Sequence, residues 1–141
     1  MKQSIALLKK LHTCFNAAKV SDAFEKLQAE KNLAIRKIPG YSEVRWTSMF
    51  SLTDVVVDRY QCILLALYNC GQDADDHSIT CAGLYHKLTQ YSFIVDIVVF
   101  HKIMSLLESL SKTLQTSSLT WHHTCSEITM VQETLSCCNT S

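Results

Sequence analysis

Apolar residues recur at three- and four-residue steps along most of the chain, which is the spacing of an amphipathic helix. The pattern predicts six helices, over residues 3–17, from a cap at Ser21 to Leu33, and over residues 46–69, 77–89, 91–116 and 119–135. One proline and three glycines are too few for the many tight turns of a β-sandwich. We therefore predict an all-α bundle of about six helices, forming a single region over residues 1–141.

The main interruption of the helical pattern is predicted near residues 36–45. The residue before Pro39 is driven toward an extended backbone, and Gly40 permits a turn. At the other end of the chain, residues 136–141 are polar and are expected to fray. The single region is thus expected to contain two helices, a break, and then the longer helices that follow it.

Two stretches admit a second interpretation. The three valines at 55–57 are typical of a strand, but the apolar stripe continues past them at helical spacing, so a helix is preferred. The acids within residues 73–76 could bind a divalent cation. We prefer a solvated loop in which Asp75 or Asp76 caps the next helix.

The charges are distributed unevenly although the chain as a whole is neutral. Residues 1–45 carry nine Lys or Arg and four Asp or Glu, a net charge of +5, which leaves −5 for the remaining residues. A basic end of this kind can bind a polyanion such as DNA, because phosphate contacts release counterions. Solvated lysines on amphipathic helices explain the same composition, and both interpretations stay open.

The seven cysteines are expected to be reduced, with mainly structural roles, in an intracellular protein. Their number is odd, no pair of Cys-x2-Cys motifs occurs, and the first residues do not form a secretory signal. No membrane partner is expected, because the most apolar run, residues 93–100, contains Asp96 and is far shorter than a membrane span.

No catalytic residue, metal site or cofactor is expected from local motifs. The phosphate-binding, dinucleotide-binding and zinc-protease motifs are absent from the sequence. His122, His123 and Cys125 form the only metal-like cluster, but His122 and Cys125 are only two ligands on one helix face, and zinc usually takes four. His101 lies in an apolar stripe and is expected to be a hydrogen-bonded histidine of the core or of its boundary, and not a ligand. No small-molecule substrate is indicated.

Four short segments, taken in order, resemble the hAT-superfamily transposases and their domesticated relatives, including the zinc finger MYM-type group. They are Arg45-Trp46-Thr47-Ser48 within residues 41–67, Ala82-Gly83-Leu84, Tyr91-Ser92-Phe93-Ile94, and Leu110-Ser111-Lys112-Thr113-Leu114-Gln115. They are similar to that group's T-R-W-x-S, A-x-G-L, F-x-F and L-S-x-x-L-Q patterns. Val44 stands where the family commonly has Thr.

The resemblance implies that this chain corresponds to the helical insertion of an RNase H-like transposase domain. The Asp, Asp and Glu of the family's catalytic core have no counterpart in this chain, so the resemblance implies a catalytically inactive fragment or domesticated derivative. It also implies that Arg45 and Trp46 contact DNA and that the protein is nuclear. The two residue types suit this role, since tryptophan can stack on an unpaired base and arginine can hold a phosphate.

Two other functions compete with the DNA-contacting one. A helical protein-interaction module would bind other protein subunits, without nucleic acid, through the acidic part of the chain. In that case Trp46 is a core anchor at a helix start and Arg45 is a surface residue. A thiol enzyme ranks third, because nothing in the sequence selects one Cys and His pair over another.

Overall fold

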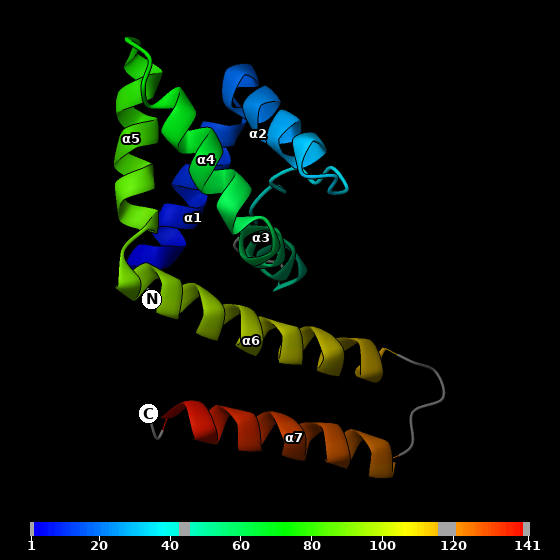
Figure 1. Cartoon of the computed structure of the whole chain (residues 1–141). Coiled ribbons are helices and arrows are strands. Elements are labelled where there is room, and N and C mark those ends of the chain that lie inside the picture. The colour runs from blue at the N-terminus through cyan, green and yellow to red at the C-terminus, as the bar shows by residue number, and fades with distance from the viewer. Residues whose placement is uncertain (1, 43–45, 116–120, 140–141) are drawn as a thin grey trace.

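A computed structural model describes residues 2–42, 46–115 and 121–139, and in these residues it contains α-helices and no strand (Figure 1). The helices are α1 (Lys2–Phe15), α2 (Ala18–Glu30), α3 (Trp46–Asp58), α4 (Tyr60–Cys70), α5 (Asp76–Leu88), α6 (Tyr91–Leu114) and α7 (Trp121–Asn139). The predicted all-α fold is confirmed.

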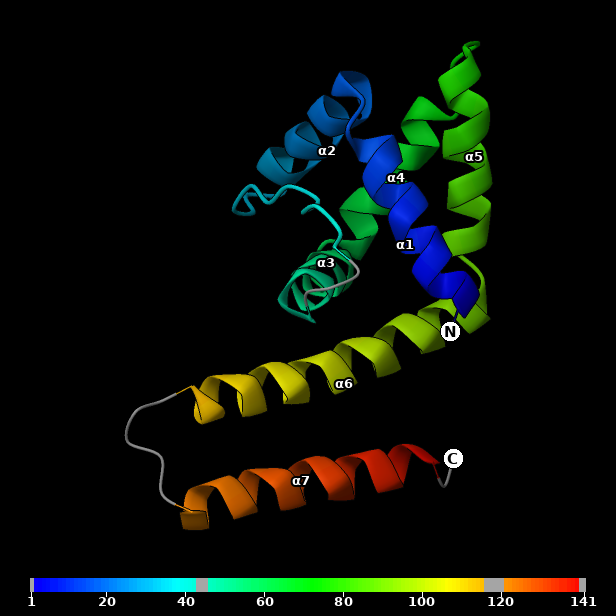
Figure 2. The same ribbon diagram turned by 180° about the vertical axis from the view of Figure 1, so that it is seen from behind.

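The helices form a body and a two-helix layer beside it. α1, α2, α4 and α5 pack around one another, and α3 lies at one end of this group (Figures 1 and 2). The long helix α6 crosses that end and packs most extensively on α3, while α7 runs back along α6 on the side away from the body. Several contacts join helices that are distant in sequence, including α1 with α5, α2 with α4 and α3 with α6.

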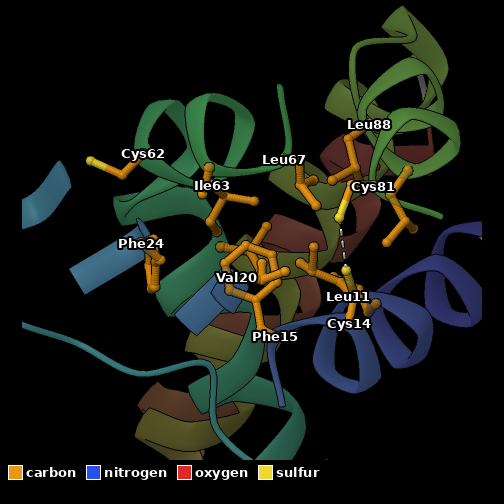
Figure 3. Packing of buried hydrophobic residues seen from close by; sticks show 14 of the residues in the cluster. Leu11, Cys14, Phe15, Val20, Phe24, Cys62, Ile63, Leu67, Cys81 and Leu88 are labelled. Carbon is orange, nitrogen blue, oxygen red and sulfur yellow. Dashed lines mark hydrogen bonds between the residues drawn. The ribbon is translucent and has the colours of Figure 1, made fainter. Parts of the chain in front are cut away.

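The core is centred where α1, α2, α4 and α5 meet (Figure 3), and it extends to residues of α3 and α6. Phe24 of α2 is 1% exposed, and its ring meets that of Phe15 edge to face, with centroids 5.2 Å apart. Leu11, Leu67 and Leu88 bring α1, α4 and α5 into the same cluster and are fully buried. Burying each side chain of this kind contributes about 1.5–3 kcal/mol, so these contacts are the main support of the short helices.

The single helix predicted over 46–69 is wrong, because the structure contains two helices that meet at Arg59. The backbone of Arg59 leaves helical geometry, with φ −111° and ψ 19°. Its side chain is nearly buried and points toward α2 and the segment after it, where Nε donates to Gln28 and Nη2 donates to the Ala34 carbonyl. These long-range contacts hold the side chain at the junction and separate α3 from α4.

The predicted cap at Ser21 is also wrong. α2 begins at Ala18 after the cap residue Ala17, and Ser21 lies within the helix. Only two residues separate the end of α1 from the start of α2, and the Asn16 amide there donates to the His12 carbonyl at 3.2 Å. This short connection sets the start of α2, and the burial of Val20 and Phe24 on one face then fixes its direction.

The prediction at Asp75 is confirmed. Its carboxylate accepts a hydrogen bond from the Ser78 amide at 2.8 Å and caps α5. The valines at 55–57 lie in a helix as expected. At the far end, α7 continues to Asn139, so residues 136–139 of the stretch expected to fray are helical. Within the described residues, no helix is long and apolar enough to cross a membrane.

Candidate functional site

The sequence singles out Arg45 and Trp46, of which Trp46 is the first residue of α3. Arg45 lies outside the described residues, and of Trp46 only the backbone is described, as the first residue of the helix. The described residues on either side of the pair are joined. The Ser42 amide donates to the Ser48 hydroxyl at 3.2 Å, and that hydroxyl donates to the Ser42 carbonyl at 3.0 Å. Ser48 therefore holds the end of the preceding segment against the first turn of α3.

Residues 33–42, here called the connecting segment, link the end of α2 to the region of Arg45 without helical structure. Near its far end, the Tyr41 ring lies under the Lys9 ammonium of α1, with 4.9 Å between the nitrogen and the ring centroid. A cation held over an aromatic face in this way contributes about 0.5–1 kcal/mol at a partly exposed site. The segment thus contacts α1 shortly before it reaches α3.

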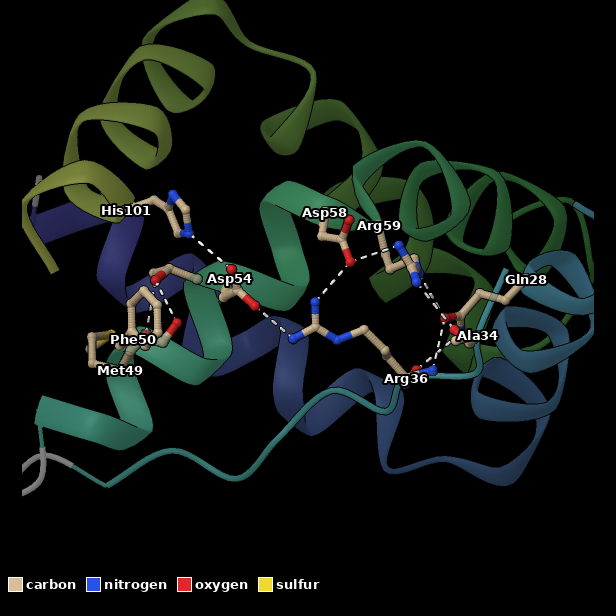
Figure 4. A network of polar contacts seen from close by, with 10 residues as sticks. Gln28, Ala34, Arg36, Met49, Phe50, Asp54, Asp58, Arg59 and His101 are labelled. Atoms are coloured by element: carbon tan, nitrogen blue, oxygen red, sulfur yellow. Dashed lines mark hydrogen bonds and ion pairs between the residues drawn. The ribbon is translucent and has the colours of Figure 1, made fainter. Parts of the chain in front are cut away.

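The start of the connecting segment is held by Gln28, a fully buried side chain of α2 (Figure 4). Its Oε1 accepts from the Arg36 amide at 2.9 Å and from Arg59 Nε at 3.2 Å. Its Nε2 donates to the Arg36 carbonyl at 3.0 Å. A buried amide is stable only when its polar atoms are paired, and here both ends are paired with the segment or with Arg59.

The Arg36 side chain then joins the connecting segment to α3 (Figure 4). Nη2 donates to Asp54 and Nη1 donates to Asp58, each at 2.7 Å. Asp58 also accepts from Arg59 Nη1 at 2.6 Å. The Arg36 guanidinium holds the pKa of Asp54 below its usual range, with a smaller contribution from His101, although partial burial of the carboxyl opposes this effect.

His101 extends this polar network to α6. Its Nε2 lies 3.1 Å from Asp54 Oδ1, and its ring stacks on Phe50 with 5.8 Å between centroids. The prediction of a hydrogen-bonded histidine at the edge of the core is confirmed. In a catalytic His and Asp pair, the carboxylate orients the histidine, and the histidine acts as a base on a nucleophile within reach. In the described part of the chain, Asp54 is the hydrogen-bond partner of His101 and no hydroxyl or thiol joins the pair, so its contacts tie α3 to α6.

The other predicted candidates are separate from this network. Among the described residues no group of three metal-type ligands occurs, and the side chains of His122 and His123 are outside the description, while Cys125 is half-buried in α7. Within the loop at 73–76, Asp73 and Asp75 form ion pairs with Lys19 at 2.6 and 2.8 Å. This arrangement agrees with the preferred solvated loop.

Two buried thiols lie close together in the core. Cys14 Sγ of α1 and Cys81 Sγ of α5 are 3.6 Å apart (Figure 3). Burial, with a further contribution from Cys81, raises the pKa of Cys14 to about 12. A thiol that is protonated and buried at neutral pH is a poor nucleophile. The contact therefore serves packing between α1 and α5.

Sequence reasoning missed Gln28 and Arg59, the residues that organise the connecting segment. The available signal at Gln28 was its position four residues after Phe24, on the face that Val20 also occupies. A polar side chain at an apolar position of this kind is usually buried with hydrogen-bond partners. Nothing local marked the role of Arg59 at the junction, because the partners that tie it to other segments, Ala34 and Gln28, are 25 and 31 residues away.

Comparison of the chain with models of protein families, with curated proteins and with solved structures finds no match. The resemblance to hAT transposases stays a prediction.

Proposed function

We propose that this chain is a catalytically inactive helical module of a hAT-transposase-like nuclear protein, and that it contacts DNA through Arg45 and Trp46. In this proposal the indole stacks on an unpaired or flipped base and the guanidinium binds a neighbouring phosphate. The contact is with the end of a DNA strand or a hairpin, where bases are free to leave the stack.

The observation that carries the proposal is the anchoring of the chain on both sides of the pair. Before it, Arg36 binds two carboxylates of α3 and Gln28 holds the Arg36 backbone. After it, Ser48 is bonded to Ser42. Anchors on both sides limit the conformations open to the chain between them. Binding of DNA would then cost less conformational entropy, which favours binding.

The charges near the segment support the same proposal. Lys9 places a positive charge over Tyr41, close to where the segment reaches α3. Asp54 and Asp58, the two carboxylates of this network, lie in the second half of α3 and are both paired with Arg36. Their negative charge is thereby offset locally, which lowers the repulsion that an approaching phosphate would meet.

The direct test measures binding of the full chain to fluorescein-labelled single-stranded and hairpin DNA by fluorescence anisotropy. We expect Trp46→Ala to weaken binding at least about tenfold, since base stacking on an aromatic side chain contributes about 1–3 kcal/mol. Trp121→Ala is the matched control, because Trp121 also begins a helix, and it should change binding less than about twofold. Equal losses in the two variants would contradict a specific role for Trp46.

The catalytic part of the proposal has its own assay. We expect no DNA cleavage or strand transfer when the purified chain is incubated with Mg²⁺ or Mn²⁺, because the metal ions of such reactions need converging carboxylates. Metal-dependent cleavage that a single Asp→Asn substitution abolishes would show the proposal to be wrong.

A second function, a helical protein-interaction module, is favoured by one observation. Large apolar side chains are exposed on the α6 and α7 layer, including Tyr91 (81% exposed), Val98 (54%) and Leu114 (52%). Exposed apolar surface commonly marks a site for a protein partner. Absence of DNA binding at a low salt concentration of about 50 mM would favour this function, because phosphate contacts are strongest at low salt.

A further inference from the structure

A pocket lies between α1 and the end of α5, away from the connecting segment. Its volume is about 400 Å³, within the range of sites that bind small molecules. It is lined by Gln3, Ala6, Leu7 and Lys10 of α1, and by His86, Lys87 and Gln90 at and after the end of α5. We call these residues the basic pocket.

The lining of the basic pocket combines cations with amide donors and contains no carboxylate. Lys10 and Lys87 approach from different helices, and neither forms an ion pair with the residues that the structure describes. Some other basic residues of the chain are paired with carboxylates. Lys19 pairs with two aspartates and Arg36 pairs with two more. The two lysines of the pocket are therefore available to bind an anion.

The walls of the basic pocket are fixed relative to each other. α1 and α5 pack directly, through the contact between Cys14 and Cys81 and through the burial of Leu11 and Leu88. The α1 residues of the lining follow helical spacing, so they form one continuous face. Ala6, an exposed residue with a small side chain, also lines the pocket. A ligand would thus meet two helix faces in a fixed arrangement, from which the exposed lysine, histidine and glutamine side chains can reach it.

We propose that the basic pocket binds a phosphate group. The two ammonium groups supply charge-assisted hydrogen bonds, and the imidazole and the amides of Gln3 and Gln90 supply further donors to the remaining oxygens. Lysine is a common phosphate-binding residue. The phosphate belongs either to a free phosphomonoester or to a nucleic-acid backbone. The site does not depend on Arg45 and Trp46, and a phosphomonoester tests it without DNA.

The test titrates the full ¹⁵N-labelled chain with inorganic phosphate and with adenosine monophosphate, followed by NMR. We expect the largest amide shifts at residues 3–10 and 86–90. The Lys10→Gln, Lys87→Gln double variant should weaken binding at least about tenfold, because two charge-assisted contacts are lost. The matched control is Lys26→Gln with Lys102→Gln, two exposed lysines of α2 and α6, which removes the same charge and should weaken binding less than about threefold.

The outcomes separate the two sources of phosphate and separate this proposal from the preceding one. Tight binding of adenosine monophosphate that the double variant loses indicates a phosphomonoester site. If the double variant instead loses binding of a single-stranded oligonucleotide far more than that of free phosphate, the ligand is a nucleic-acid backbone. Trp46→Ala should leave adenosine monophosphate binding unchanged in either case. Shifts spread evenly over all lysines, or equal losses in the double variant and its control, would overturn the proposal.

Discussion

Replacing Gln28 with Ala should destabilise the protein by about 3 kcal/mol, because this fully buried side chain makes several hydrogen bonds, some of them with part-buried partners. The substitution removes the acceptor of the Arg36 amide and of Arg59 Nε, and the donor to the Arg36 carbonyl. Each net hydrogen bond contributes about 0.5–1.5 kcal/mol, and buried groups left without partners add to the loss. The cavity left by the side chain acts in the same direction.

The measurement is urea unfolding followed by far-ultraviolet circular dichroism. With a slope of about 1–3 kcal/mol/M, a loss of this size lowers the unfolding midpoint by about 1–3 M. Hydrogen exchange gives a local readout, since the Arg36 amide should lose protection relative to amides of the α4 core. Under the proposed function, the same variant should also bind DNA more weakly, because the connecting segment loses its anchor.

The control is Gln132→Ala, which removes an exposed glutamine within α7. An exposed substitution of this kind is expected to change the free energy of unfolding by less than about 0.5 kcal/mol. If Gln28→Ala were as stable as this control and the Arg36 amide stayed protected, the hydrogen bonds of Gln28 would not be what anchors the connecting segment.

Two further predictions concern acid and thiol chemistry. Since the pKa of Asp54 is lower in the folded state, its ion pair should stabilise the protein above about pH 4, the usual pKa of an aspartate, and this stabilisation should be lost as the pH falls further. Asp54→Asn should therefore lower the urea midpoint at pH 7 and lower it less at pH 3. A second prediction concerns the thiols. In the native protein the three cysteines of α7 should react with a thiol reagent within minutes, whereas the four buried cysteines should react only in urea. Equally fast reaction of all seven thiols would contradict the packing of the core.

Features with local causes were predictable from the sequence. The all-α fold follows from the three- and four-residue spacing of apolar positions, and the cap at Asp75 follows from its place just before an apolar stripe. His101 was expected at the edge of the core because it falls within such a stripe. In each case the residues that form the sequence pattern and the structural feature that it predicts lie within a few helical turns of each other.

Features with distant causes were not predictable. The helix break at Arg59 depends on partners in α2 and in the connecting segment, and an arginine in a helical pattern gives no sign of them. The basic pocket likewise combines Lys10 and Lys87, which are far apart in the chain and meet only because α1 packs on α5. For Arg45 and Trp46, the sequence supplied the residues, and the structure adds the anchors on either side of them.

The packing of α1 on α5 also has a consequence for how the chain acquires its fold during synthesis. α1 leaves the ribosome before α5, which ends only at Leu88, so the apolar face of α1 lacks this partner while the intervening helices are being made. Contacts between distant segments also slow folding, because a long loop must close before any of them form. A nascent chain that stalls before Leu88 would expose Leu11 and Cys14, a surface that chaperones recognise and that favours aggregation.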